Sequence, residues 1–467
     1  MTRVRFVRNS HARLRVVPVG EGKEPPRPDR AALAGFTGAE GQVTELVGRT
    51  RRLLLLGTGA APDYEAAGAL AVARSLLETH IALDARALDT DQAVAFATGA
   101  CLRAWRFDRL RTQQDPRCPR LEDLDVLVED RAAARAAGAL LLAVMKGVWF
   151  ARDLVTEPGN VLTPQGFATR LARLEREGVQ VEILDTAQLD AEGFGCLLAV
   201  GAASQHPPCL AVLRWRGAGD GPPVVLVGKG VTFDTGGVSI KPATGMWDMR
   251  ADMAGAAACA GALLATALRR SPTPVIAVLP LVENAIGANA YRPGDVLRSH
   301  SGRTVEVVDT DAEGRLILAD ALSWAAQHLR PTALIDLATL TGSIVTALGH
   351  DRAGLFGNAA LGARLMAAGA AVGERLWPMP IGDEHTDAIK SDIADLRQCG
   401  SGKSQPDASN AAAFLREFTG GVPWAHLDIA GMELREPGDW YDPDRHALGA
   451  TGFGVRLLDR FLLDLTA

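Results

Sequence analysis

Three carboxylates fall within five residues of one another between Val307 and Leu322. They belong to Asp309, Asp311 and Glu313, and Arg315 follows two residues later. Carboxylates this close together repel one another unless positive charge lies between them, and a single arginine does not balance three acids. Divalent metal ions bind oxygen ligands of this kind. The segment therefore predicts a metal site.

A second acidic segment, earlier in the chain, has the same character. It follows the apolar run Val224 to Val227, contains four glycines and carries Lys229, Asp234 and Lys241, and Asp252 begins the next helical pattern. Glycines allow the backbone to approach a bound group closely. The spacing of a phosphate-binding P-loop is absent, so the segment favours a metal over a phosphate.

Both segments require elements that bring their acids together. Apolar runs typical of strands alternate with helical patterns at Ala251 to Arg269 and Gly314 to His328, which predicts a mostly parallel sheet with helices on both faces. Ligands bind such sheets at the carboxyl ends of the strands. The predicted strands are Val179 to Leu184, Leu197 to Val200, Leu210 to Trp215, Val224 to Val227, Val275 to Leu279, Thr304 to Val308 and Leu334 to Leu337.

The chain divides into two predicted α/β domains. Leu14 to Val19, Leu53 to Leu56 and Ile81 to Leu83 read as strands of a small first unit, and Ala132 to Val155 forms one long helical pattern. We expect residues 1–132 to form the N-terminal α/β domain, residues 133–157 a connecting helix, and residues 158–467 the larger catalytic domain.

Composition narrows the class of protein. A chain of 467 residues with 48% hydrophobic and 22% charged residues is typical of a globular protein with large cores. A formal net charge of -6 makes general nucleic-acid binding unexpected. No signal-type segment and no run of roughly 20 apolar residues is apparent, which predicts a cytoplasmic protein without a membrane span. Six scattered cysteines without a Cys-x-x-Cys pair predict reduced thiols.

Seven motifs in the same order resemble the leucyl aminopeptidase family, also called the cytosol aminopeptidases. The resemblance runs from about Ala151 to the C-terminus. The motifs are Val227-Gly-Lys-Gly, Phe233-Asp-Thr-Gly-Gly, Ser239-Ile-Lys-Pro, Ala251-Asp-Met, Thr310-Asp-Ala-Glu-Gly-Arg-Leu, Ala338-Thr-Leu-Thr-Gly and Trp424-Ala-His-Leu-Asp-Ile-Ala-Gly.

The resemblance implies a peptidase with two divalent metal ions per subunit. Zinc or manganese is expected, with magnesium possible in one site. The implied catalytic cations are Lys241 and Arg315, and the implied metal ligands are Lys229, Asp234, Asp252, Asp311 and Glu313. Four carboxylates would balance two divalent ions, provided that Lys229 loses its proton to become a ligand.

The implied reaction removes the N-terminal residue of a peptide. A hydroxide that bridges the ions attacks the first peptide carbonyl, Lys241 stabilises the oxyanion, and a bicarbonate held by Arg315 carries the proton to the leaving amine. A pocket of medium apolar character would favour leucine and methionine. Its implied lining is Met249, Thr339, Leu340, Gly342 and Ala430, and Glu433, just beyond it, predicts some tolerance of basic side chains.

One position departs from the family pattern. Asp309 stands where the family usually has asparagine, so a group that could donate a hydrogen bond is replaced by one that, when ionised, only accepts. Family members are usually hexamers, which makes a homo-hexamer the expected assembly. Two other functions remain open from the residues: a DNA-binding or regulatory relative with weak peptidase activity, and a two-metal phosphoesterase.

Overall fold

The computed structural model describes residues 2–25, 35–113, 115, 118–219, 221–400, 405–435 and 447–466. These residues form two compact units, which divide between Met145 and Lys146. The second unit comprises Lys146–Arg435 and Gly449–Ala467. The domain boundaries expected at residues 132 and 157 stay a prediction.

The first unit contains a six-stranded sheet in the order β1-β6-β5-β2-β4-β3. All neighbouring pairs are parallel except β3 with β4. Helices α2 and α3 pack closely on each other, because Gly68 and Gly99 bring their backbones together. The elements are β1 (Arg3–Val7), β2 (Leu14–Val19), β3 (Val43–Val47), β4 (Arg52–Gly57), α2 (Tyr64–Ala73), β5 (His80–Asp84), α3 (Thr90–Ala104) and β6 (Asp123–Leu127).

Helix α4 (Arg131–Thr156) runs without a break across the point at which the units divide. It corresponds to the long helical pattern of the sequence. By length and composition, α4 and the helical stretch Ala243–Leu268 are apolar enough for a membrane span, but the apolar windows are 44% and 89% buried inside the protein. Such burial is typical of core helices as well, so this is weak evidence for a membrane.

The second unit is built on a nine-stranded mixed sheet in the order β16-β15-β18-β14-β9-β11-β8-β7, with β10 beside β11. The central strands β18, β14, β9 and β11 are parallel, and β7, β8 and β15 join in antiparallel pairs. The strands are β7 (Gln180–Leu184), β8 (Cys209–Trp215), β9 (Val224–Gly228), β10 (Gly230–Asp234), β11 (Val275–Asn284), β14 (Ala333–Ala338), β15 (Ala353–Gly357), β16 (Leu376–Pro378) and β18 (Trp424–Asp428).

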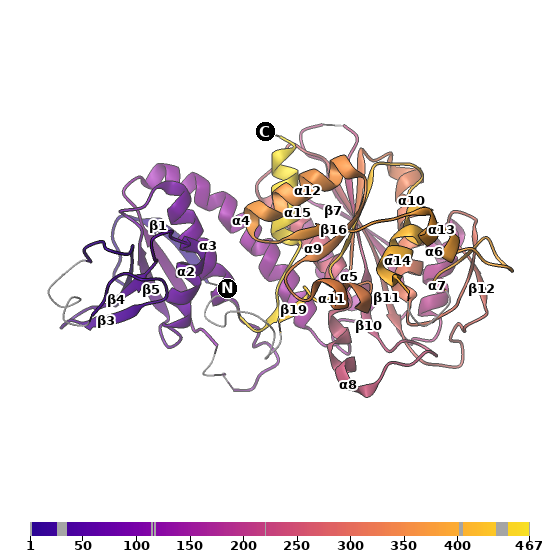
Figure 1. Cartoon of the computed structure of the whole chain (residues 1–467), viewed down its shortest axis with the longest axis horizontal. Helices are drawn as coiled ribbons and strands as arrows, with labels where there is room; N and C mark the ends of the chain where they lie inside the picture. Colours follow the sequence, from indigo (N-terminus) through magenta and orange to yellow (C-terminus); the bar gives the residue numbers. More distant parts are fainter. Residues whose placement is uncertain are drawn as a thin grey trace. The chain divides into compact units, whose positions relative to one another are not determined.

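Helices cover both faces of this sheet. Figure 1 shows α9 (Ala254–Leu268), α12 (Ala359–Val372) and α15 (Val455–Asp464) on one side of the strands, and α10 (Glu313–Leu329), α14 (Asp407–Arg416) and α7 (Gly195–Gly201) on the other. The mostly parallel α/β fold predicted from the sequence is confirmed. The remaining helices are α5 (Pro164–Leu171), α6 (Thr186–Glu192), α8 (Ala243–Met246), α11 (Gly342–Leu348) and α13 (Asp383–Ala388), with 3-10 turns η1 (Ala172–Glu177) and η2 (Trp247–Ala251).

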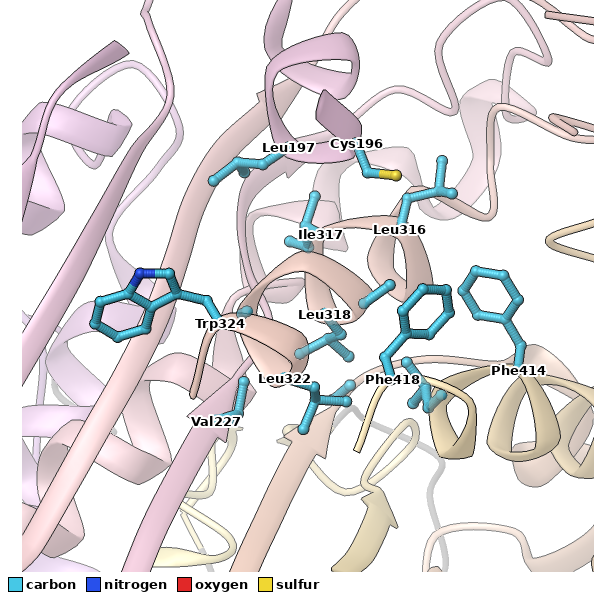
Figure 2. Packing of buried hydrophobic residues seen from close by; sticks show 14 of the residues in the cluster. Cys196, Leu197, Val227, Leu316, Ile317, Leu318, Leu322, Trp324, Phe414 and Phe418 are labelled. Atoms are coloured by element: carbon cyan, nitrogen blue, oxygen red, sulfur yellow. The ribbon is translucent and has the colours of Figure 1, made fainter. Parts of the chain in front are cut away.

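Helix α10 lies at the centre of the larger hydrophobic core. Leu316, Ile317, Leu318 and Leu322 are fully buried, and Figure 2 shows them between the strand that carries Val227 and helices α7 and α14. Full burial of a leucine or isoleucine side chain stabilises a fold by about 1.5–3 kcal/mol. The N-terminus of α10, which carries Glu313, is therefore held firmly in place.

The predicted strand Leu197–Val200 is wrong, because these residues belong to helix α7. A four-residue apolar run suits a buried strand and a buried helix equally. The helical state is stabilised by Asp320 of α10. Its carboxylate accepts hydrogen bonds from the backbone N–H groups of Cys196 and Leu197 at 2.9 and 3.0 Å. These are N–H groups that the first turn of a helix cannot bond internally.

The strand predicted before the acidic segment is shorter than expected and lies in a different sheet. Strand β13 (Thr304–Glu306) pairs with β12 (Val296–Arg298) and β17 (Leu396–Arg397) in a separate three-stranded sheet. Strands β19 (Leu434–Arg435) and β20 (Gly449–Ala450) form a small antiparallel pair. The six cysteines form no disulfide in the described part of the chain.

Candidate metal centre

The carboxyl ends of the central strands meet at one edge of the large sheet, and polar residues gather there. Lys229 follows β9, Asp234 ends β10, Asn284 ends β11 and Thr339 follows β14. Strand β10 is paired with β11 up to Asp234 and Asn284, which places these two side chains next to each other. Parallel strands thus bring residues far apart in sequence to one site.

Lys229 lies buried at the middle of this edge. Its Nζ is 2.8 Å from Oδ1 of Asp252 and 2.9 Å from Oε1 of Glu313, and it donates a hydrogen bond of 2.9 Å to the carbonyl oxygen of Thr339. Burial alone would lower the pKa of this amine, but the carboxylates of Asp252 and Glu313 raise it above its usual value. Lys229 therefore carries a proton in the absence of metal.

Three buried acids surround this lysine. Ligand oxygens of Asp234, Asp252 and Glu313 all lie within 4.8 Å of one another. Oδ2 of Asp252 and Oε2 of Glu313 are buried, and neither has a hydrogen-bond partner in the described part of the chain. A buried carboxylate oxygen without a partner is costly. Oxygens with this geometry and exposure can serve as ligands of a divalent ion.

Lys241 joins two of the acids. Its Nζ lies 2.9 Å from Oδ2 of Asp234 and 2.6 Å from Oδ1 of Asp311. Its side chain is 20% exposed, whereas that of Lys229 is 4% exposed. Lys241 is therefore the lysine that solvent, or a substrate, can reach.

The site carries more negative than positive charge. Four carboxylates face two lysines, a net charge of -4 + 2 = -2 if all are ionised. Burial and the neighbouring Asp234 raise the pKa of Asp311 to about 7. Burial, with Glu313 and Asp234 nearby, also raises the pKa of Asp252 well above its ordinary value despite the opposing effect of Lys229. Added cations would relieve this repulsion.

Two glycines give the site its shape. A Cβ on Gly314 would lie 2.6 Å from Cε and 2.8 Å from Nζ of Lys229, so only glycine lets the lysine pass beside the start of α10. Gly236 has a φ of +85°, and a Cβ there would lie 2.9 Å from Oδ1 of Asp311. Both positions require glycine for the close approach that the sequence predicted.

Sequence reasoning missed the residues that hold the acids in position. The side-chain amide of Asn284 donates to Oδ1 of Asp234 at 2.8 Å and to the carbonyl oxygen of Thr310 at 3.0 Å. The hydroxyl of Tyr291 donates to the same Thr310 oxygen at 2.7 Å. The available signal was a polar residue, Asn284, at the end of the long apolar run of β11.

Arg315 lies in the first turn of α10 and is 2% exposed. Its Nη1 donates to the carbonyl oxygen of Gln398 at 3.0 Å, and its Nη2 donates to both oxygens of Asp407, at 3.0 and 3.1 Å. Asp407 is the first residue of α14 and was not singled out from the sequence. The structure thus gives Arg315 an anion from the chain itself.

The predicted pocket residues lie around the same edge of the sheet. Thr339 donates from its hydroxyl to Oδ1 of Asp252 at 2.7 Å. The backbone N–H groups of Leu340 and Ala430 both donate to Oδ1 of Asp428, at 3.1 and 3.3 Å. Met249 lies in the 3-10 turn that leads to Asp252, and Gly342 begins α11 with open space where a Cβ would be.

Asp309 and Glu433 are two further acids that were singled out from the sequence. Oδ1 of Asp309 accepts a hydrogen bond of 2.9 Å from the backbone N–H of Asp311, an interaction that an asparagine oxygen could also make. Burial raises the pKa of Glu433 to about 7, and its Oε2 is buried without a hydrogen-bond partner in the described regions.

Comparison with known protein families matches residues 149–459 to the catalytic domain of the cytosol aminopeptidase family. A probable cytosol aminopeptidase of Caulobacter vibrioides is 44% identical over 452 residues, covering 93% of this chain and 90% of the relative. Another, from Gluconobacter oxydans, is 47% identical over 367 residues, covering 78% of this chain and 74% of the relative.

Solved structures show the same likeness over the whole chain. The bottromycin maturation enzyme BotP in complex with Mn is 33% identical, with a TM-score of 0.88 and coverage of 98% of this chain and 100% of BotP. A mutant of tomato leucine aminopeptidase is 30% identical, with a TM-score of 0.86 and coverage of 99% of this chain and 97% of the tomato enzyme.

Proposed function

Because this chain belongs to the cytosol aminopeptidase family and is a metal-dependent aminopeptidase, we propose that its buried acidic cluster holds two divalent metal ions. The observation that carries the proposal is the pair of unpartnered buried oxygens, Oδ2 of Asp252 and Oε2 of Glu313, beside Lys229 in the described part of the structure. The proposed ligands are Lys229, Asp234, Asp252, Asp311 and Glu313.

The residues present fit such a centre. Hard carboxylate oxygens suit manganese or magnesium as well as zinc. A net charge of +4 on two ions would balance the four carboxylates, and it would favour the release of a proton from Lys229 so that its amine could bind. When bound, divalent ions supply Lewis acidity and lower the pKa of water, so that hydroxide is available at neutral pH.

Lys241 is proposed to stabilise the oxyanion that forms on the peptide carbonyl. In the structure its ammonium lies between Asp234 and Asp311, and it is more exposed than Lys229. Once the acids are engaged as ligands, the ammonium is available to donate to a negatively charged oxygen. A donor that is already in place when charge develops is the effective form of such stabilisation.

Arg315 is proposed to hold the anion that carries a proton to the leaving amine. Bicarbonate is the candidate implied by the family resemblance. Any external anion would share or take the place of Asp407, which already binds the Nη2 of Arg315 with both oxygens. Bicarbonate should therefore bind Arg315 only weakly while Asp407 is present.

The substrate is proposed to be a peptide with a free amino terminus and a leucine or methionine as its first residue. The wall made by Met249, Leu340 and Ala430 is apolar, and Leu340 and Ala430 pack against the large core.

We also propose zinc or manganese as the native ions, a homo-hexameric assembly and a cytoplasmic location. Light scattering of the purified protein tests the assembly.

The test of the function is removal and return of metal. The purified chain is treated with a chelator, dialysed, and assayed with leucine p-nitroanilide and with p-nitrophenyl phosphate before and after addition of manganese or zinc. Loss of leucine p-nitroanilide hydrolysis on chelation, and its recovery with metal, is expected. Hydrolysis of the phosphate ester alone would support a phosphoesterase and contradict the proposal.

A further inference from the structure

A second group of side chains that could hold a metal ion lies at the other end of α10. Ligand atoms of Glu192, His300 and His328 lie within 4.8 Å of one another. Glu192 ends α6, His300 lies between β12 and β13, and His328 is in the last turn of α10. At 1.5 Å per residue, the 15 residues from Glu313 to His328 place this group roughly 22 Å from the peptidase centre.

Two adjacent residues of α10 anchor all three side chains. Nδ1 of His300 lies 2.9 Å from the hydroxyl of Ser323, and Nδ1 of His328 lies 3.0 Å from the carbonyl oxygen of Trp324. The indole Nε1 of Trp324 donates to Oε2 of Glu192 at 3.2 Å. Figure 2 shows Trp324 on α10, at the edge of the hydrophobic core that fixes the helix.

The anchoring selects the form of histidine that binds metals. A carbonyl oxygen only accepts hydrogen bonds, so Nδ1 of His328 carries the hydrogen and Nε2 of the neutral ring keeps its lone pair for a ligand. Metal-binding histidines typically donate their other N–H to such an oxygen. The ring of His328 also stacks on Trp324, with centroids 5.1 Å apart and an angle of 20° between the planes, which limits its rotation.

The separation of the ligand atoms suits a metal better than a direct ion pair. Nε2 of His328 lies 3.7 Å from Oε2 of Glu192, too far for a good hydrogen bond. Ligands of a tetrahedral zinc ion, at roughly 2.0–2.1 Å from the metal, lie about 3.3 Å from one another, so small side-chain movements close the site. Burial and the neighbouring His328 lower the pKa of His300, which favours its neutral, ligating form.

We propose that Glu192, His300 and His328 bind one divalent transition-metal ion of the zinc class, separate from the peptidase centre. Two imidazoles and one carboxylate suit zinc better than magnesium or calcium. The ion would link the end of α6, the loop between β12 and β13, and the C-terminal turn of α10. This site does not depend on the proposed peptidase mechanism.

Zinc content tests the site. The wild-type protein and the His328→Ala, Glu192→Gln and Ser323→Ala variants are equilibrated with zinc ions, and bound zinc per chain is measured by mass spectrometry and titration calorimetry. His206→Ala, which changes a histidine outside the cluster, is the control. We expect His328→Ala and Glu192→Gln to hold one zinc ion fewer than wild type, and Ser323→Ala to bind that ion about 10- to 100-fold more weakly.

Leucine p-nitroanilide hydrolysis with manganese is measured on the same samples. It should be unchanged in His328→Ala and Glu192→Gln, which separates this site from the peptidase centre. If His328→Ala does not fold, the near-isosteric Glu192→Gln decides. Equal zinc content in wild type and Glu192→Gln, or an equal loss in His206→Ala, would overturn the proposal.

Discussion

Replacement of Asp407 by alanine is expected to make this enzyme respond to lower concentrations of bicarbonate. Asp407 is the carboxylate that occupies the guanidinium of the buried Arg315, with both oxygens at 3.0 and 3.1 Å from Nη2. An external anion that binds the same guanidinium must displace it. The Asp407→Ala variant removes this competitor and leaves the bond from Arg315 to the carbonyl oxygen of Gln398 in place.

The expected magnitude follows from burial. Loss of one partner of a fully buried ion pair costs about 3–5 kcal/mol. The side chain of Asp407 is 37% exposed, so solvent screens part of the interaction. With this screening taken into account, the interaction between Asp407 and Arg315 contributes about 1.4–2.8 kcal/mol. Each 1.4 kcal/mol is a factor of about ten in an equilibrium constant, so Asp407 should weaken the binding of a competing anion roughly 10- to 100-fold.

The assay is hydrolysis of leucine p-nitroanilide in buffer purged of carbon dioxide, with bicarbonate added stepwise at constant ionic strength and saturating manganese. The concentration of bicarbonate that gives half-maximal activation should fall roughly 10- to 100-fold in Asp407→Ala relative to wild type. Chloride at the same ionic strength is the control for a general salt effect. An identical bicarbonate response in the two proteins would refute the reasoning.

Three further changes test particular features of the centre. Glu433→Met should lower the ratio of lysine to leucine p-nitroanilide turnover by roughly tenfold. In wild type this ratio should rise as the pH passes through about 7, because burial raises the pKa of Glu433 to about 7 and the charged carboxylate predominates above that pH. An unchanged ratio in the variant would contradict a role in specificity. Asp309→Asn should keep or raise activity, since an amide oxygen can accept the 2.9 Å hydrogen bond from Asp311, and a collapse of activity at unchanged metal content would count against this. Gly314→Ala should lower metal affinity and kcat about tenfold or more, because the added Cβ would lie 2.6 Å from Cε of Lys229, and calorimetry showing wild-type affinity would exclude that steric account.

The part of the acidic centre that follows apolar strands of the large sheet could be predicted from the sequence. Lys229 and Asp234 belong to one glycine-rich segment at the ends of β9 and β10, and the structure places them beside Asp252 and Glu313. The alternation of strand and helix patterns likewise predicted the parallel sheet that brings these ends to one edge. Local pattern and global fold agree in this part of the chain.

What the sequence did not reveal depends on contacts between distant segments. The pairing of Arg315 with Asp407 joins residues 92 positions apart, and nothing in the local pattern around Asp407 indicates it. The helical state of α7 depends on the carboxylate of Asp320, which lies 124 residues after Cys196. The group formed by Glu192, His300 and His328 comes from three separate elements. Such tertiary contacts override short-range preference.

The most direct test of the account is the number of metal ions bound in the buried acidic cluster. Manganese per chain is measured after equilibration and gel filtration for wild type, Asp252→Asn and the control Asp248→Asn. Asp248 lies in η2, the turn just before Asp252, and pairs with Arg250 of the same turn. The account predicts two manganese ions in wild type and in the control, with one or both lost from Asp252→Asn together with leucine p-nitroanilide hydrolysis. Full manganese content and full activity in Asp252→Asn would contradict it.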